Sequence, residues 1–559
     1  MSNKLELTWV GKNDEINVEP RLLVEDKEKS NCVNDPSTEN MIIHGDNLLA
    51  LKALENKYSG QIKCIYIDPP YNTGSAFEHY DDNLEHSIWL DLMRRRLISL
   101  RTLLKNDGFI ACHIDDSEGA YLKILMDEVF GRNNYETTIY VRVRYPEKTL
   151  KQDMNYHKEI EQIHVYRKSS ESIPNFMTEL VGYEKFKYYI REISAGVKTE
   201  LGGKTVEIFT EEQYEVVSGE GSEEGLKEIW ASGTILDGNS SGRFFRDYLT
   251  GRVETDGLGV LYKVWGIGDD KFDYRYFTGP KRKGATKGKY YQGVPIDKLE
   301  ANQMTRKVPI NNFYDLAASF GNCRTEGGVG FRGGKKPEKL LHIILTLFSN
   351  EGDLVLDSFL GSASTIATAQ KMKRRYIGIE MGEHAYSLCK VRLDRVIAGD
   401  KTGISKEIGW QGGGAYKFYE LAPTLINKDD FDEYVINHEY DADMLASAVA
   451  LHEGFIFQPN KEVFWKQSVG SENSYLFVTT RHIDASYIDS IQSTMEDDEF
   501  LIIACRSYSK DVEKRYLNIV IKKIPQMLLN RCEFNKENYN LNIINPPIYD
   551  YDEEEENEY

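Results

Sequence analysis

The apolar run 62–67 ends abruptly at Asp68-Pro69-Pro70-Tyr71, and this junction constrains the fold more than any other stretch of the chain. A nearly continuous apolar run of this length is typical of a strand buried in a parallel sheet. Proline cannot donate to a sheet ladder, so two consecutive prolines end the strand and stiffen the loop that follows. The loop therefore begins at the carboxyl end of a strand, where ligands bind in open α/β sheets.

The four residues of this loop suit methylation of an exocyclic amine on a nucleobase. Such an amine is a weak nucleophile because its lone pair is delocalised into the ring. The Asp68 side chain and the Pro69 carbonyl can each accept one N–H, which favours the pyramidal, nucleophilic form, and Tyr71 can stack on a flipped base. A rigid turn at a strand end is the alternative, because four residues can match by chance.

Alternating strands and helices surround this loop. Strands are predicted at 41–44, 62–67, 108–114, 352–357 and 375–379, and helices at 48–56, 87–105, 117–130, 339–348 and 365–373. Strand–helix alternation at this spacing predicts an α/β fold with a parallel, Rossmann-like sheet. Arg94-Arg95-Arg96 lies within the second helix, where we expect a solvated face.

A second loop, 358–364, follows the predicted strand 352–357 and consists mostly of small residues. Small residues let a backbone approach a ligand closely at a helix N-terminus. Glu380 ends the next strand, about 20 residues after Gly361, and an acid at that distance commonly binds ribose hydroxyls. A generic dinucleotide site is the competing interpretation, but the loop lacks GxGxxG. Asp46, just past strand 41–44, could hold the adenine amine of a cofactor or cap the following helix.

The formal net charge of −20 argues against a nucleic-acid partner, but the charge is unevenly distributed. Residues 401–559 contain 15 Lys and Arg against 29 Asp and Glu, so most of the acidity is C-terminal. Residues 271–291 are instead basic, with interleaved aromatic residues that can stack on bases. An ordinary basic loop is the alternative. We expect DNA contact at Lys281, Arg282, Lys283, Lys287 and Lys289.

Other site classes are disfavoured by the sequence. The seven cysteines are scattered without a CxxC pair, which argues against a zinc site and a disulfide framework and fits a reducing cytoplasm. No cysteine follows a proline as the nucleophile of cytosine-C5 methyltransferases does. No apolar run of about 18 residues predicts a membrane span, and the N-terminus has no apolar segment typical of a signal peptide.

Asp68 to Tyr71, continued by Asn72-Thr73-Gly74, resembles motif IV of the amino-methyltransferases. With Trp89-Leu90-Asp91-Leu92-Met93 and Asp107-Gly108-Phe109-Ile110, it is similar to the β-class adenine-N6 DNA methyltransferases, above all to the modification (Mod) subunits of Type III restriction–modification systems. The loop after Asp357 resembles motif I, usually Asp-Pro-Phe-x-Gly-Ser-Gly. Ser358 replaces the proline and Ala363 the second glycine. Because alanine is also small, we expect cofactor binding to be retained.

The resemblance implies S-adenosyl-L-methionine as cofactor, with Asp68, Pro69, Pro70 and Tyr71 as catalytic residues. It places the cofactor contacts at Asp46, Lys336, Pro337, Asp357, Phe359, Gly361, Ser362, Ser364 and Glu380. Methyl transfer needs no metal, and none is expected. The implied partners are double-stranded DNA, a second copy of the chain and a restriction (Res) helicase–nuclease subunit.

The expected activity is therefore site-specific DNA adenine-N6 methylation in the cytoplasm. Cytosine-N4 methylation and a DNA-recognition subunit without turnover are the alternatives. The domains expected are an N-terminal arm (1–40), a catalytic half (41–140), a target-recognition domain (141–330), a cofactor-binding half (331–425), a small C-terminal α/β domain (426–549) and an acidic tail (550–559).

Overall fold

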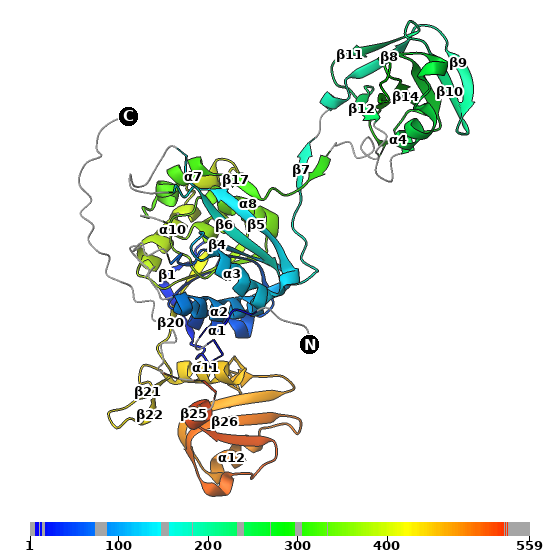
Figure 1. Cartoon of the computed structure of the whole chain (residues 1–559). Helices are drawn as coiled ribbons and strands as arrows, with labels where there is room; N and C mark the ends of the chain where they lie inside the picture. Colours follow the sequence, from blue (N-terminus) through cyan, green and yellow to red (C-terminus); the bar gives the residue numbers. More distant parts are fainter. Residues whose placement is uncertain are drawn as a thin grey trace, which may run out of the picture. The chain divides into compact units, whose positions relative to one another are not determined.

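The computed structural model describes residues 6–9, 12–13, 17–72, 86–146, 156–180, 183–231, 240–268, 270–296, 305–331, 334–529, 531–532 and 534. The chain divides into two compact units. One consists of Met1–Asn175 with Asn311–Tyr559, and the other is the insertion Phe176–Ile310 (Figure 1). Thr73, Gly74 and the acidic tail lie outside the described residues.

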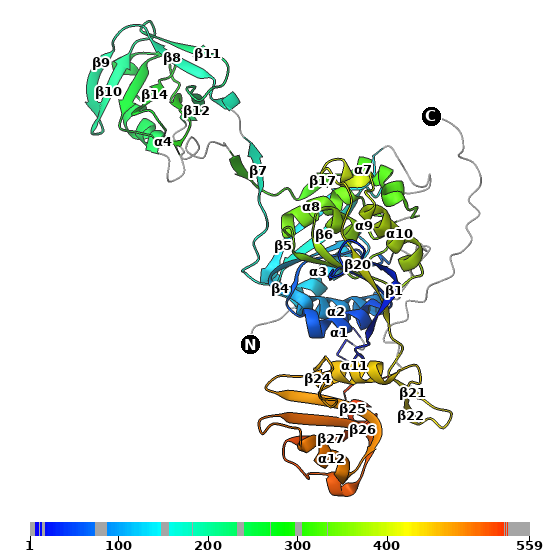
Figure 2. The same ribbon diagram turned by 180° about the vertical axis from the view of Figure 1, so that it is seen from behind.

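The first unit is built on a ten-stranded sheet (Figures 1 and 2). In spatial order, its strands are β1 (Leu23–Asn31), β20 (Tyr416–Leu421), β2 (Met41–His44), β19 (Arg375–Glu380), β18 (Leu354–Asp357), β3 (Ile62–Ile67), β4 (Leu104–Ile114), β6 (Ile160–Arg167), β5 (Tyr135–Arg142) and β17 (Phe313–Asp315). The six strands from β20 to β4 are parallel, and β6 runs antiparallel to β4 and β5. The α/β class predicted from the sequence is confirmed.

Helices cover both faces of this sheet, as parallel strands require. One face carries α1 (Asn47–Tyr58), α2 (His86–Leu103) and α3 (Gly119–Met126), and the other carries α8 (Glu338–Phe348), α9 (Ser364–Lys371) and α10 (Val391–Ile397) (Figures 1 and 2). The strands between them read as apolar runs because both of their faces are buried. Trp89 and Met93 of α2 are fully buried in the core on one face.

The two halves of the chain meet where β18 pairs in parallel with β3. Val355 lies opposite Cys64, and Leu356 lies opposite Ile65. Asp357 ends one of these strands and Asp68 follows the other. Side chains from two distant sequence segments therefore meet at one edge of the sheet.

The second unit contains a six-stranded antiparallel sheet. Its strands are, in spatial order, β12 (Lys227–Ala231), β15 (Gly288–Gln292), β14 (Tyr274–Thr278), β13 (Leu261–Trp265), β10 (Lys204–Phe209) and β9 (Val197–Leu201). Two strand pairs join β8 (Tyr188–Glu192) to β11 (Tyr214–Ser218) and β7 (Met177–Leu180) to β16 (Thr305–Val308). This unit is narrower than the range 141–330, because β6 and β17 belong to the sheet of the first unit. Its role in target recognition stays a prediction.

The C-terminal part carries a five-stranded sheet of its own. In spatial order its strands are β23 (Ile456–Phe457), β24 (Ser468–Val469), β25 (Ser474–Ile483), β26 (Phe500–Tyr508) and β27 (Ile519–Lys523), accompanied by α11 (Ala442–Glu453), α12 (Ala485–Gln492) and α13 (Gln526–Leu529). The last three strands are parallel.

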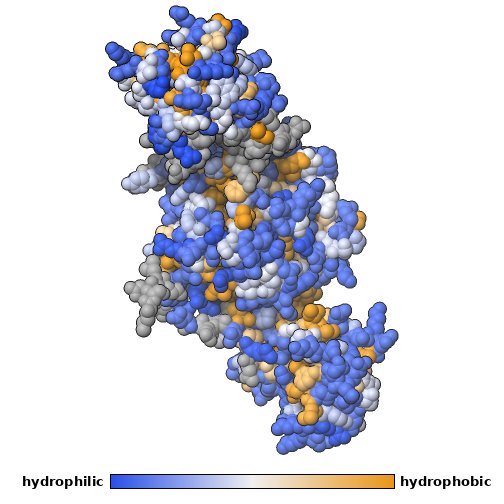
Figure 3. Space-filling view, turned by 90° about the vertical axis from the view of Figure 1, so that its right-hand side faces the viewer, coloured by the Kyte–Doolittle hydropathy of each residue, from blue (hydrophilic) through white to orange (hydrophobic). Residues whose placement is uncertain are grey.

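The surface drawn in Figure 3 is mostly hydrophilic, with hydrophobic side chains scattered over it. Over the described ranges, no helix is both long and apolar enough to cross a membrane. No group of His, Cys, Asp or Glu within those ranges could hold a metal ion.

Gly108 of β4 offers a test of the contact between β3 and β4. A Cβ added there would lie 2.9 Å from the carbonyl oxygens of Ile62 and Lys63. Backbone atoms cannot rotate away, so we expect Gly108→Ala to lower the free energy of unfolding by about 1–3 kcal/mol, measured by urea denaturation. Gly321→Ala is the control. It lies in α7 (Ala317–Asn322) with open space around the added methyl, so it should be neutral or slightly stabilising. Equal effects of the two substitutions would contradict this account.

Candidate active site

A side chain of α2 holds the backbone of the Asp68 loop by a hydrogen bond. The indole Nε1 of Trp89 donates to the carbonyl oxygen of Pro70 at 2.8 Å, and the Trp89 side chain is fully buried. Asn72 adopts a left-handed conformation with φ 58° and donates through Nδ2 to Glu118 at 2.8 Å. The described part of the loop is therefore held at Pro70 and at Asn72.

Asp68 belongs to a compact polar cluster with Tyr71, Lys336 and Glu161. The Tyr71 hydroxyl lies 2.9 Å from Asp68 Oδ1 and 3.0 Å from Glu161 Oε2. Lys336 Nζ lies 2.7 Å from the Tyr71 hydroxyl, 3.2 Å from Asp68 Oδ2 and 3.3 Å from Glu161 Oε2. One cation and one hydroxyl thus bridge two carboxylates.

The charges of this cluster stabilise one another. Burial opposes ionisation of Glu161, but the charge of Lys336 and the groups of His113 and Tyr71 lower its pKa well below the usual range. Burial likewise opposes the charge of Lys336, yet Asp68 and Glu161 raise its pKa. The pKa of Tyr71 is raised well above its usual value by burial and by the two carboxylates. Lys336 and Glu161 are therefore charged at neutral pH, and Tyr71 keeps its proton.

A second layer lies behind Glu161. His113 of β4 is fully buried, and its Nε2 lies 2.8 Å from Glu161 Oε2. Its Nδ1 lies 2.7 Å from the hydroxyl of Tyr66, which is also buried. Glu161 is thus held from the side of the sheet as well as from the loop.

The loop after β18 adopts a tight, left-handed geometry. Gly361 has φ 54° and Ala363 has φ 58°, a region that an alanine occupies at a cost of about 1–2 kcal/mol. Ser362 and Ser364 are buried, with their hydroxyl oxygens 3.2 Å apart. The departure from glycine at 363 therefore leaves the left-handed turn in place.

Asp357 and Phe359 are buried at the start of this loop. Asp357 accepts hydrogen bonds from Thr365 Oγ1 at 2.6 Å and from the backbone N–H of Phe359 at 3.0 Å. Burial raises the pKa of Asp357 to about 7, and the nearby charge of Asp68 adds to the rise, while the two hydrogen bonds oppose it.

Glu380 and Asp46 both brace backbone in this structure. The nearly completely buried carboxylate of Glu380 accepts from the backbone N–H groups of Gly361 at 2.7 Å and Gly382 at 3.0 Å. Asp46 caps α1 by accepting from Leu48 and Leu49, the capping role that the sequence had left open. Asp46 also forms an ion pair with the buried Arg96 at 3.1 Å.

Arg96 corrects one expectation. The solvated helix face predicted for the three arginines does not hold here, because Arg96 is fully buried and also donates to the Asn47 side chain. Asn47 in turn donates to the Ser358 carbonyl at 2.7 Å. Arg96 therefore helps to tie α1 and α2 to the loop after β18.

Pro337 precedes a buried ion cluster centred on Glu338. Glu338 accepts from Arg392 Nη2 at 2.9 Å and from Lys371 Nζ at 2.8 Å, and all three side chains are fully buried. Arg392 also donates to the Ser362 carbonyl at 3.0 Å and the Ser364 hydroxyl at 2.6 Å. The cluster fixes the loop 358–364 against the segment that carries Lys336.

The five basic residues expected to contact DNA divide into two kinds. Lys281, Arg282, Lys283 and Lys287 are exposed in the loop between β14 and β15, without an ion pair to any residue of the described ranges. Lys289 lies in β15 and pairs with Glu228 at 2.7 Å. The neighbouring aromatics Tyr276, Phe277, Tyr290 and Tyr291 are buried core residues rather than free stacking surfaces.

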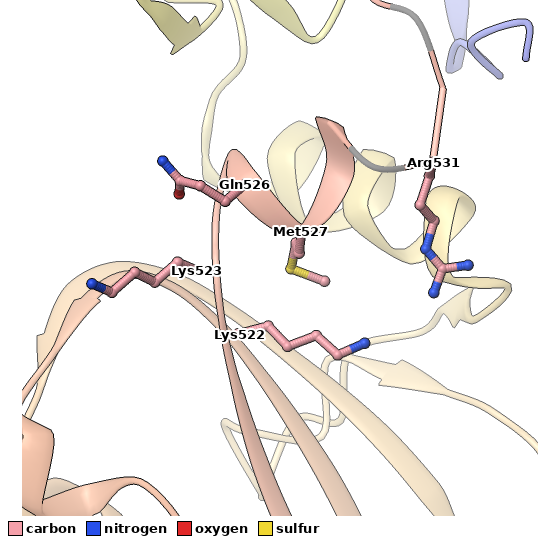
Figure 4. A pocket seen from close by; sticks show the side chains of 5 residues that line it. All are labelled: Lys522, Lys523, Gln526, Met527 and Arg531. Atoms are coloured by element: carbon pink, nitrogen blue, oxygen red, sulfur yellow. The ribbon is translucent and has the colours of Figure 1, made fainter.

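A second group of cations lines a groove of about 710 Å³ in the C-terminal part (Figure 4). Lys522 and Arg531 both pair with the buried carboxylate of Glu453, at 3.3 and 2.8 Å. In Figure 4, Lys523 points away from these two side chains. Two of the three cations thus neutralise a buried acid, which is a structural role.

A sequence profile of the DNA methylase family matches residues 62–391, more than half of the chain. The chain belongs to the DNA methylase family. It is 33% identical to the probable Type III restriction-modification enzyme HindVI Mod subunit of Haemophilus influenzae over 427 residues, which cover 69% of this chain and 54% of that protein. It is 25% identical to the StyLTI Mod subunit of Salmonella typhimurium over 423 residues, 70% of this chain and 57% of that protein.

A third relative, the EcoP15I Mod subunit of Escherichia coli, is 24% identical over 515 residues, 78% of this chain and 74% of that protein. The predicted resemblance to Type III Mod subunits is confirmed. The chain spans a little over half the length of the HindVI and StyLTI relatives.

The sequence analysis missed the structural roles of several charged residues of this DNA methylase that are buried or nearly so. These are Arg96, His113, Glu161, Glu338 and Arg392. His113 interrupts the apolar end of β4, a signal that could have drawn attention to it. The other four have polar neighbours or stand at a helix start, so the local pattern carries no such signal. Their partners lie far away in the sequence, so spacing alone could not pair them.

The raised pKa of Asp357 predicts a pH-dependent stability. A carboxyl whose pKa is about 7 when folded and about 4 when unfolded contributes stability below pH 4 that is lost as the pH rises through 7. Asp357→Asn cannot ionise, so its stability relative to wild type should rise by roughly 2–4 kcal/mol between pH 4 and pH 8. Urea unfolding at several pH values measures this difference. A difference that does not vary with pH would contradict the assignment.

Proposed function

We propose that this chain transfers a methyl group from S-adenosyl-L-methionine to N6 of an adenine flipped out of double-stranded DNA. We further propose that it serves as the modification subunit of a Type III restriction–modification system. The observation that carries the proposal is the position of two loops. The Asp68 loop and the loop 358–364 follow adjacent parallel strands, β3 and β18, so an amine-binding carboxylate lies beside a cofactor-type loop.

Three features suit the cofactor. Gly361 faces open space, since an added Cβ would approach only Phe331, at 3.9 Å. Ser358 Oγ is buried without a hydrogen-bond partner among the described residues. The N-terminus of α9 follows the loop. The residues that would hold the cofactor are Asp46, Lys336, Pro337, Asp357, Phe359, Gly361, Ser362, Ser364 and Glu380. S-adenosyl-L-methionine, when bound, supplies the methyl group from a sulfonium.

The chain's own residues orient and activate the amine. The Asp68 carboxylate and the Pro69 carbonyl accept its two N–H groups, and Tyr71 stacks on the base. The hydrogen bond from Trp89 to Pro70 fixes the loop backbone that presents these acceptors. After transfer, the amine carries one proton too many, and Asp68 is the base within reach. Correct positioning of this kind can contribute an effective molarity on the order of 10⁵ M.

DNA contact is proposed for the insertion 176–310, through the exposed basic loop with Lys281, Arg282, Lys283 and Lys287. Lys289 is the fifth expected contact. The names of the relatives support a Type III system, in which a second copy of this chain and a Res helicase–nuclease would be the partners. A DNA substrate also supports a location in the cytoplasm.

Transfer of labelled methyl from S-adenosyl-L-methionine to unmethylated DNA, followed by digestion to nucleosides, tests the reaction. Label in N6-methyladenine is expected, whereas label in N4-methylcytosine would support the cytosine alternative. Absence of label together with measurable cofactor binding would support a recognition-only subunit, or a requirement for a partner. Absence of both label and cofactor binding would overturn the proposal.

Removal of the Asp68 carboxylate should separate chemistry from cofactor binding. We expect Asp68→Ala to lower kcat by at least about 10³-fold, because the amine loses both its acceptor and its base. Cofactor affinity, measured by calorimetry, should change less than about threefold. Asp116→Ala removes a carboxylate that follows the next strand and is 64% exposed, and it should methylate normally. Wild-type turnover by Asp68→Ala would refute the role of Asp68.

Neutralising the basic loop should weaken DNA binding because fewer cations then face the phosphates. For the fourfold change of Lys281, Arg282, Lys283 and Lys287 to Gln, the slope of log Kd against log salt should fall by about one unit for each cation that pairs with a phosphate in the wild type. The matched control changes four exposed lysines outside the insertion, Lys406, Lys461, Lys510 and Lys514, to Gln. Equal weakening by both variants would assign the effect to net charge rather than to this loop.

A further inference from the structure

Glu161 lies at the candidate active site but belongs neither to the Asp68 loop nor to the loop 358–364. It is the second residue of β6, on the segment between β5 and the inserted unit. The antiparallel pairing of β6 with β4, in which Gln162 lies opposite Ile114, brings Glu161 to the edge of the sheet where Asp68 lies. Its side chain is 15% exposed, close to the 19% of Asp68.

The contacts of Glu161 converge on a single oxygen. Oε2 lies within 3.3 Å of the Tyr71 hydroxyl, the Lys336 ammonium and His113 Nε2. Two of these groups, Tyr71 and Lys336, also contact Asp68. Asp68 and Glu161 are therefore joined through the same two bridges, although they stand on different strands.

The donors of the bridges are shared between the two carboxylates. An ammonium has three donors, and those of Lys336 face Asp68, Tyr71 and Glu161. A hydroxyl has one donor, and that of Tyr71 lies between the two carboxylates. Without the second carboxylate, Lys336 and Tyr71 would direct their donors at Asp68 alone. They would then compete with the substrate amine for the same two oxygens.

We propose that Glu161 is a positioning residue of the methyl-transfer site. It draws part of the charge of Lys336 and the hydroxyl of Tyr71 away from Asp68, so that lone pairs on the Asp68 oxygens stay available to the amine and the Tyr71 ring is held in one place. His113 holds Glu161 from behind. This role rests on the proposed amine methylation, and Glu161 itself touches neither the base nor the cofactor.

Glu161→Gln tests the role, because it keeps the shape of the side chain and removes its charge. We expect kcat for methyl transfer to fall about 10- to 100-fold, while KM for DNA and Kd for S-adenosyl-L-methionine change less than about threefold. A DNA with 2-aminopurine at the target position should fluoresce more strongly when bound to the variant, because Tyr71 no longer stacks in a fixed orientation.

Glu159→Gln is the matched control. Glu159 lies two residues away and pairs with Arg142 at 3.3 Å, outside the cluster. The Glu159→Gln substitution should leave kcat and the 2-aminopurine fluorescence as in wild type. A Glu161→Gln enzyme with kcat within about twofold of wild type, or the same loss in both variants, would overturn the proposal. If the wild type itself transfers no methyl group, the proposed function fails, and this outcome is recognisable because no variant is involved.

Tyr71→Phe keeps the test decisive if Glu161→Gln fails to fold. This substitution removes the Tyr71 hydroxyl, which is one of the two bridges between Asp68 and Glu161, and retains the aromatic ring. The same selective loss of kcat is expected. In a folded Glu161→Gln/Tyr71→Phe double variant, the combined loss should be smaller than the product of the two single losses, because both changes break the same bridge. Independent, multiplying losses, or no loss in Tyr71→Phe, would contradict the bridge.

Discussion

Parallel pairing between β3 and β18 is the constraint on which the rest of the structure depends. These strands come from segments almost 300 residues apart, yet they lie side by side, so the loops that follow them open onto the same edge of the sheet. Both strands are buried on both faces, which their apolar sequences require. If this pairing were lost, Asp68 and Asp357 would no longer be neighbours, and neither loop would form a site by itself.

Buried or nearly buried charged side chains hold the two loops in place. Around Asp68, one lysine and one tyrosine bridge two carboxylates. Around the loop 358–364, Glu338 is shared between Lys371 and Arg392, and all three are fully buried. Breaking a buried pair of this kind typically costs about 3–5 kcal/mol, because an uncompensated charge stays in the interior. Such clusters leave little freedom to the backbone atoms that they contact, which suits a site that must position an amine.

Local sequence patterns predicted much of this arrangement. The strand before Asp68, the prolines that end it, the loop of small residues after β18 and the acid that ends β19 follow from hydrophobic periodicity and from the properties of proline and glycine. The environment of the aromatic residues in the insertion was harder to predict from the sequence. These interleaved aromatic residues had suggested stacking on bases, but Tyr276, Phe277, Tyr290 and Tyr291 are buried in the core of an antiparallel sheet. A period-2 pattern does not reveal which face is covered until the sheet partners are known.

The sequence by itself determined the fold class, the family and the two loops, because these depend on residues close together in the chain. Only the tertiary structure decided which charged side chains meet. Arg96 is buried against Asp46 rather than solvated. Lys336 reaches Asp68, and Glu161 pairs with the same lysine from a third segment of the chain. The physical reason is that an ion pair depends on distance in space, and parallel strands with long crossovers bring together residues whose separation in sequence carries no record of it.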